Sequence, residues 1–236
     1  MAQISRKQLK SDEFVSGMDA AYEFFLQHRN RIILIAVVVL VVAGGGYGFY
    51  AWRNARNQKA ALQLSQAVAT LHVPLATDSG VAAGTATYPD AAHRAQAAEP
   101  QLQAVINAYG GTPAGQLARY YLGLAQLDAN DAAAAENTLN TAAASSDPVA
   151  STAAKHALAN LAIAQGQPAQ AHALLLQLVQ QDSATLPRAV ALMELADLDR
   201  TYNPKEAAQY YKQLQSDYPG TATAQQAQQD LANLGQ

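Results

Sequence analysis

The longest run of apolar and uncharged residues lies near the N-terminus, at residues 32–52. A helix rises about 1.5 Å per residue, so a run of this length crosses a hydrocarbon core about 30 Å thick. Basic side chains stand on both sides, with Arg29 and Arg31 before the run and Arg53 and Arg56 after it. The pattern predicts one transmembrane helix over residues 32–52. A cleaved signal peptide is the alternative, but its apolar region is usually only about 7 to 15 residues long.

Basic residues are more numerous before this run than after it, five against three. The imbalance favours an N-terminus in the cytoplasm. Inside the run, Gly44 and Gly48 have the spacing at which two helix backbones approach closely, so a homodimer or a partner helix could pack there. Glycine is also simply common in membrane helices, and both interpretations stay open.

The segment before the predicted span, residues 1–31, favours an amphipathic helix. Ser11 can cap a helix that carries Phe14, Met18, Tyr22 and Phe25 along one face, with acidic residues opposite. Such a helix either lies on the membrane or docks on a protein. We expect residues 1–31 to be a cytoplasmic segment.

Residues 53–72 continue a helical pattern, whereas residues 73–92 contain several prolines and glycines and no periodicity. We therefore expect residues 53–92 to be a helical extension and a linker. A loop of about 20 residues is uncommon inside a compact domain. Either this loop marks a domain boundary, or it hides a short helix.

Residues 93–236 repeat at an interval of 36 residues, at which small or apolar positions recur together. The recurring triads are Ala135, Leu139 and Ala142, then Ala171, Leu175 and Leu178, then Ala207, Tyr211 and Leu214. Helix-breaking positions recur with them at Asp131, Gln167 and Asn203, and Ala98, Leu102 and Val105 form an earlier half-copy. The pattern predicts three and a half to four helical hairpins, and Thr221 as the N-cap of a closing helix. The predicted fold class is all-α.

Composition and charge exclude several function classes. The chain has no cysteine, so disulfides, thiol nucleophiles and thiolate metal sites are ruled out. From residue 73 to the end, seven basic residues stand against fourteen acidic ones. A phosphate backbone needs a basic face, so we expect no nucleic-acid partner.

The five histidines, His28, His72, His93, His156 and His172, are scattered without the spacing of a metal motif. His156 and His172 could approach each other across one hairpin, but no carboxylate stands at a suitable helical spacing. No phosphate-binding loop, dinucleotide fingerprint or nucleophile elbow is present. We therefore expect no catalytic residue, no cofactor and no metal, and the protein is predicted not to be an enzyme.

The repeat units resemble the tetratricopeptide repeat. Leu122-Gly123 and the pairs Ala135 to Leu139 and Ala171 to Leu175 match its pattern, although Arg119 replaces the early aromatic residue. The resemblance implies a helical-hairpin solenoid whose first helices line a protein-binding groove. The implied groove positions are Tyr120, Leu124, Leu127, His156, Asn160, Ile163, Met193, Asp197 and Arg200. Alternatively, these side chains pack a tight superhelix that has no usable groove.

The whole layout resembles the YfgM-like family of bacterial inner-membrane proteins, with one span and a divergent repeat domain outside. The resemblance implies an ancillary subunit that associates with the Sec translocon and with periplasmic chaperones. Two functions follow as hypotheses. One is a membrane-anchored adaptor or chaperone-like subunit that presents its periplasmic repeats to secretory or envelope-assembly proteins. The other is a structural spacer that oligomerises through its membrane and juxtamembrane helices.

Overall fold

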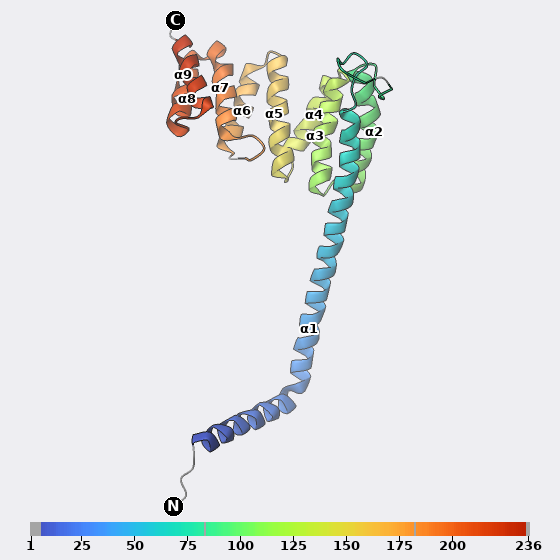
Figure 1. Ribbon diagram of the computed structural model, residues 1–236, viewed down its shortest axis with the longest axis vertical. Helices are drawn as coiled ribbons and strands as arrows, with labels where there is room; N and C mark the ends of the chain where they lie inside the picture. Colours follow the sequence, from blue (N-terminus) through green and yellow to red (C-terminus); the bar gives the residue numbers. More distant parts are fainter. Residues whose placement is uncertain (1–5, 83, 182, 235–236) are drawn as a thin grey trace, which may run out of the picture. The chain divides into compact units, whose positions relative to one another are not determined.

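The computed structural model describes residues 6–82, 84–181 and 183–234, and the side chains of residues 6–25, 32 and 36 lie outside this description (Figure 1). Within the described residues the chain is helical, with no strand beyond one isolated bridge. The prediction of an all-α fold is therefore confirmed. The chain divides into two compact units, Met1–Ala55 and Arg56–Gln236.

The first unit consists of the N-terminal part of helix α1, Arg6–Leu71. Within Leu26–Leu71, an 18-residue window has a mean hydropathy of 2.5, and none of it is buried. By length and composition, this helix can cross a membrane. The helix begins at Arg6, so the prediction that Ser11 caps it is wrong, because Ser11 lies inside the helix. The predicted apolar face before residue 26 falls on side chains outside the described ones.

The second unit stacks consecutive helices, each packed on the next in the chain (Figure 1). After the end of α1 come α2 (Ala91–Tyr109), α3 (Pro113–Asp128), α4 (Ala132–Ala143), α5 (Pro148–Ala164), α6 (Pro168–Gln180), α7 (Arg188–Tyr202), α8 (Pro204–Asp217) and α9 (Ala222–Leu234). The end of α1 joins α2 and α3 in one apolar cluster through Leu64 and Ala67. The described residues of the unit thus form four hairpins and a closing helix, and the Thr221 hydroxyl caps α9 at the Ala224 amide. Both features confirm the sequence prediction.

The positions that recur every 36 residues in the sequence are the positions that form the buried core. All nine positions of the three triads are buried, and the most exposed of them, Leu178, is only 1% exposed. They lie on α4, α6 and α8, the second helices of their hairpins. In the third triad the middle position is Tyr211, whose hydroxyl donates a hydrogen bond of 2.7 Å to Asp197. Burial, followed by this carboxylate, raises the pKa of Tyr211, so the phenol remains a neutral donor.

Two hairpin turns have the same backbone geometry, again 36 residues apart. Asn130 and Gly166 both adopt a left-handed conformation, with φ of 62° and 70°. In each turn the next amide donates to the carbonyl five residues earlier, at 2.8 Å. This arrangement is the Schellman motif, which ends α3 and α5 and satisfies carbonyls that would otherwise lack partners.

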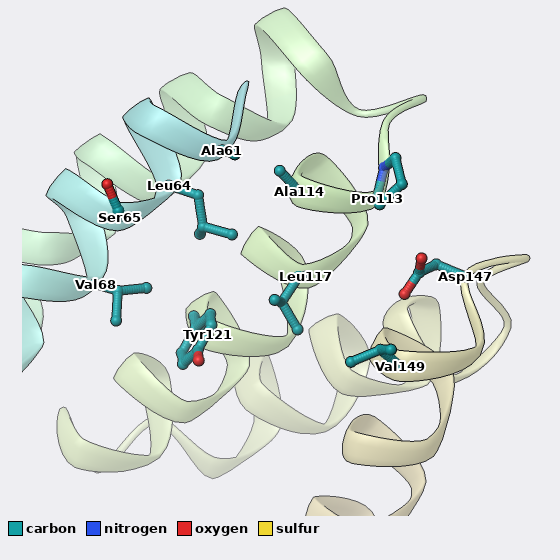
Figure 2. A pocket seen from close by; sticks show the side chains of 10 residues that line it. All are labelled: Ala61, Leu64, Ser65, Val68, Pro113, Ala114, Leu117, Tyr121, Asp147 and Val149. Atoms are coloured by element: carbon teal, nitrogen blue, oxygen red, sulfur yellow. The ribbon is translucent and has the colours of Figure 1, made fainter. Parts of the chain in front are cut away.

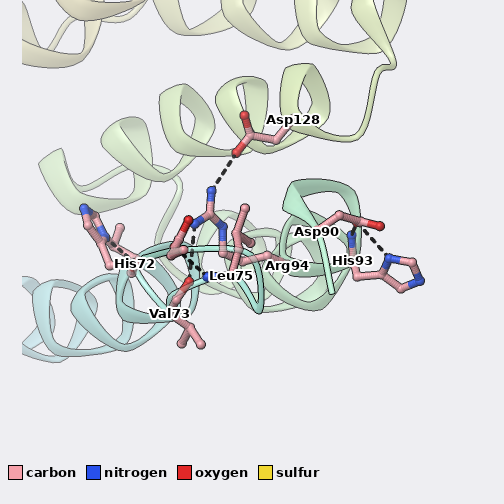
Figure 3. A network of polar contacts seen from close by, with 9 residues as sticks. His72, Val73, Leu75, Asp90, His93, Arg94 and Asp128 are labelled. Carbon is pink, nitrogen blue, oxygen red and sulfur yellow. Dashed lines mark hydrogen bonds and ion pairs between the residues drawn. The ribbon is translucent and has the colours of Figure 1, made fainter. Parts of the chain in front are cut away.

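The long connection between α1 and α2 is a closed loop, with its ends tied together at Leu75 and Tyr88. Figure 3 shows Arg94 beside Val73, where its guanidinium donates to the Val73 carbonyl at 3.3 Å and pairs with Asp128 at 3.5 Å. The described residues of the loop contain no helix, and the loop lies in the unit that begins at Arg56. The domain limits 53–92 and 93–236 stay a prediction.

Replacing Gly115 with alanine should destabilise the second unit. An added Cβ would overlap the Tyr109 carbonyl, which is held in place because the amide and the hydroxyl of Thr112 both donate to it at 2.8 Å. We expect a loss of about 2 kcal/mol and a fall of about 5 °C in the thermal unfolding midpoint of the purified chain. Gly111 is the matched control, because a Cβ there meets nothing within 4 Å. Equal midpoints for the two variants would contradict this packing.

Candidate functional site

An apolar hollow of about 410 Å³ opens on the second unit between the end of α1, the start of α3 and the start of α5. Figure 2 shows Leu64 and Val68 of α1 facing the side of α3 that carries Leu117 and Tyr121, with Val149 across the space. Its full lining is Ala61, Leu64, Ser65, Val68, Pro113, Ala114, Leu117, Tyr121, Asp147 and Val149. We call this surface the apolar hollow.

Helical spacing explains why these side chains converge. Leu64 with Val68, and Leu117 with Tyr121, are each four residues apart, so each pair lies on one face of its helix. Val149 follows the N-cap residue of α5, Asp147, whose carboxylate accepts the Ala150 amide at 2.9 Å. Because the carboxylate caps the helix, the single acidic group of the hollow already has a partner. Val149 nevertheless stays 46% exposed, so its apolar surface is available to a ligand.

The lining of the apolar hollow suits an apolar ligand. Apart from Asp147, the lining contains no charged residue. Its volume lies within the range of about 300 to 1,000 Å³ that is usual for ligand sites. A short helix that presents apolar side chains at spacings of three and four residues matches such a surface.

A second hollow, also about 410 Å³, lies between α5 and α7 and is more polar. We call it the polar hollow, and its lining is Asn160, Ile163, Glu194, Asp197, Leu198, Thr201 and Tyr202. Beside it, the Glu194 carboxylate accepts from Nε2 of His156 with both oxygens, at 3.0 and 2.8 Å. This hydrogen bond raises the pKa of His156, although partial burial opposes the shift.

The predicted groove positions divide between different surroundings. Asn160, Ile163 and Asp197 line the polar hollow, and His156 is paired beside it. Tyr120, Leu124 and Leu127 instead pack, partly buried, against the cluster around Leu139 and Leu158. Met193 is partly buried against the C-terminal core, and Arg200 is exposed in the last turn of α7. Their role in binding a partner stays a prediction.

Sequence reasoning missed most of the apolar hollow. The α1 side chains were assigned to an extension outside the repeats, although Leu64, Val68 and Leu71 recur at helical spacing and signal a packed face. On α3, the predicted Tyr120 packs against the cluster around Leu139 and Leu158, while its neighbour Tyr121 packs against the N-terminal cluster and lines the apolar hollow.

The sequence shows no carboxylate at a helical spacing from His156 or His172, yet each histidine has a carboxylate partner in the folded chain. The partner carboxylates come from the next hairpin: Glu194 for His156, and Asp199 for His172 at 3.0 Å. The two residues of each pair are separated by 38 and 27 positions, so the pairs cannot be predicted from local sequence spacing.

Successive helical hairpins with hollows between their first helices define a helical-repeat protein, a class whose members serve as scaffolds for protein–protein interaction. The chain belongs to the family defined by the tetratricopeptide repeat-like domain, whose profile matches residues 23–190. Proteins of this fold are typically non-catalytic scaffolds.

Two solved structures are similar to this chain, both of a Podosopora anserina protein described as a kinesin light chain with nearly identical TPR-like repeats, one of them a point variant. Each is 23% identical and covers 60% of this chain and 77% of its own, with TM-scores of 0.47 and 0.48. Among curated proteins, none matches the chain.

Replacing Glu194 with glutamine should cost stability at low pH and little at high pH. The folded-state pKa of His156 is raised, so the ion pair stabilises the fold fully below the unfolded pKa of about 6.5. That contribution is lost as the pH rises through the folded pKa. Because the pair is partly exposed, we expect about 0.5 kcal/mol, or about 1–2 °C in the unfolding midpoint at pH 6.

The measurement is thermal unfolding of both proteins at pH 6 and pH 9. A Glu136→Gln variant is the control, because Glu136 forms no ion pair among the described residues. If the unfolding midpoint of Glu194→Gln differs from that of the wild type by the same amount at both pH values, the proposed stabilisation by protonated His156 is contradicted.

Proposed function

We propose that this protein is a membrane-anchored scaffold or chaperone-like subunit that binds apolar segments of other proteins through its repeats. The anchor is the helix over residues 32–52, with the N-terminus in the cytoplasm and the repeats in the periplasm of a bacterial inner membrane. Its partners are secretory or envelope-assembly proteins near the translocon, as the layout shared with the YfgM-like family implies.

The observation that carries this proposal is the apolar hollow. The hollow lies open on the repeat unit, and its lining is nearly uncharged, so it offers apolar surface to a ligand. Secretory proteins cross a membrane while still unfolded, so their apolar segments need a transient partner. Burying such a segment would contribute about 25 cal/mol for each Å² of apolar surface removed from water.

The anchor rests on a separate observation. Large apolar side chains such as Leu34 and Leu40 in the predicted span are 66% and 71% exposed, and no described residue of the first unit covers them. Exposure of this kind is unfavourable in water but not in hydrocarbon. The five basic residues before the span and three after it support the cytoplasmic N-terminus.

The alternative function, a spacer that oligomerises through its membrane helix, has one supporting observation. At Gly44 and Gly48, an added Cβ would meet no atom of the described residues within 4 Å, which leaves this face of the helix open. A second helix could approach closely there.

Topology is tested by fusing a reporter enzyme that is active only outside the cytoplasm after Gln236. We expect activity from this fusion, and none when the same reporter precedes Met1. A second reporter that fluoresces only in the cytoplasm should show the opposite pattern. Fluorescence from the C-terminal fusion would place the repeats in the cytoplasm and overturn the proposed partners.

Binding is tested with a photo-crosslinking side chain at Ser65, an exposed residue that lines the apolar hollow. We expect adducts with a secretory precursor that is arrested during export, and a loss of these adducts in the Val149→Glu variant, because a charged group in the hollow disfavours an apolar ligand. Leu62→Glu is the matched control, since Leu62 is 61% exposed and lies outside the lining.

The same assay separates the two functions. Replacing both Gly44 and Gly48 with isoleucine should leave the precursor adducts unchanged under the scaffold proposal. If precursor adducts are absent from the wild type, while these isoleucines abolish a crosslinked oligomer, the spacer function replaces the proposed one.

A further inference from the structure

Three metal-ligating side chains converge where α6, α7 and α8 meet. His172 of α6 lies with Nδ1 3.0 Å from a carboxylate oxygen of Asp199 on α7, and with Nε2 4.0 Å from the carboxylate of Glu206 on α8. One ligand atom from each residue can be chosen so that all three lie within 4.8 Å of one another. The cluster is therefore made by tertiary packing and lies outside both hollows described above.

Asp199 places a nearly buried carboxylate in this cluster. Its side chain is 4% exposed, and one carboxylate oxygen, Oδ2, is buried and accepts no hydrogen bond from any described residue. Among the described residues, neither Asp199 nor Glu206 forms an ion pair with a lysine or arginine. A buried carboxylate is costly unless it is paired or coordinates a metal, and a neutral histidine compensates only one of its oxygens.

The cluster is accessible from solvent. A hollow of about 380 Å³ has His172, Asp199 and Glu206 among its lining residues. The side chain of Glu206 is 45% exposed and that of His172 is 27% exposed. An ion can therefore reach the His172 and Glu206 donors at the edge of the cluster, and the half-exposed Glu206 side chain is free to move toward it.

We propose that His172, Asp199 and Glu206 are the ligands of a divalent transition-metal ion, with Zn²⁺ as the best match. Imidazole nitrogen and carboxylate oxygen are both ligands of Zn²⁺ in proteins, at bonds of about 2.0 to 2.2 Å, and three protein ligands leave a fourth position for water. A divalent ion balances the two carboxylates and supplies the partner that Oδ2 of Asp199 lacks. The absence of sulfur ligands disfavours soft ions such as Cu⁺.

The other histidine pairs of the chain show what distinguishes this site. His156 is paired with Glu194 alone, and His93 with Asp90 alone. Both pairs offer one carboxylate, whereas His172 stands between two. His156 is therefore a matched control, with a similar exposure and the same kind of partner.

Metal binding would link three helices of two neighbouring hairpins. An ion that binds only the folded state stabilises it in proportion to the logarithm of its free concentration. At about 100 times Kd, we expect the unfolding midpoint to rise by about 5 °C. The ion would then stabilise the packing of the last two hairpins of the repeat stack.

The test uses the full chain in detergent, stripped with a chelator and free of any histidine tag. We expect calorimetric titration with ZnCl₂ to show one ion per chain, and Co²⁺ to give the visible absorption of a coordinated ion. Glu206→Gln and His172→Gln should each weaken zinc binding at least about tenfold, because loss of even an outer partner of a metal site costs about 10- to 100-fold. His156→Gln should bind as the wild type does.

Two results would overturn the proposal. One is a wild-type Kd weaker than about 1 mM. The other is zinc binding that both His172→Gln and Glu206→Gln leave unchanged, which would mean an adventitious ion only. Glu206 is half exposed, so its substitution keeps the fold intact and the outcome interpretable even if a change at Asp199 prevents folding.

Discussion

The packing of alanines where neighbouring helices cross is the constraint on which the rest of this structure depends. Ala135, Ala171 and Ala207 are completely buried, each one turn before a larger buried residue on the same helix. A larger side chain at these crossings would separate the helices, because interiors are close-packed. No single hairpin covers its own apolar face, so each depends on its neighbour, and the stack ends only where α9 presents a glutamine-rich side.

The hollows follow from this arrangement. The second helices of the hairpins carry the buried triads of the core. Part of the surface of the first helices, α1, α3, α5 and α7, stays uncovered. Toward the N-terminal end of the stack that surface is apolar, and between α5 and α7 it carries acidic residues. One solenoid therefore offers two chemically different sites, and the apolar one includes the helix that continues into the predicted membrane span.

The groove positions were hard to predict because neighbouring residues on a helix point in different directions. One residue corresponds to a rotation of about 100°, so an error of one position exchanges a surface residue for a packed one. Tyr120 and Tyr121 are both partly buried, but Tyr120 packs against the cluster around Leu139 and Leu158, whereas Tyr121 packs against the N-terminal cluster and lines the apolar hollow. The register of the 36-residue period is better defined than that of the groove positions, because the same buried positions recur in three copies.

The helices, their order, the repeat and the apolar segment could be predicted from residue patterns, because each depends on local periodicity, capping residues and short turns. Which side chains meet across helices could be known only from the packed fold. The pairing of His156 with Glu194, and the convergence of His172 with Asp199 and Glu206, join residues 27 to 38 positions apart. Such contacts depend on how one hairpin is rotated against the next, and that rotation is set by the sum of many small packing contacts rather than by any motif.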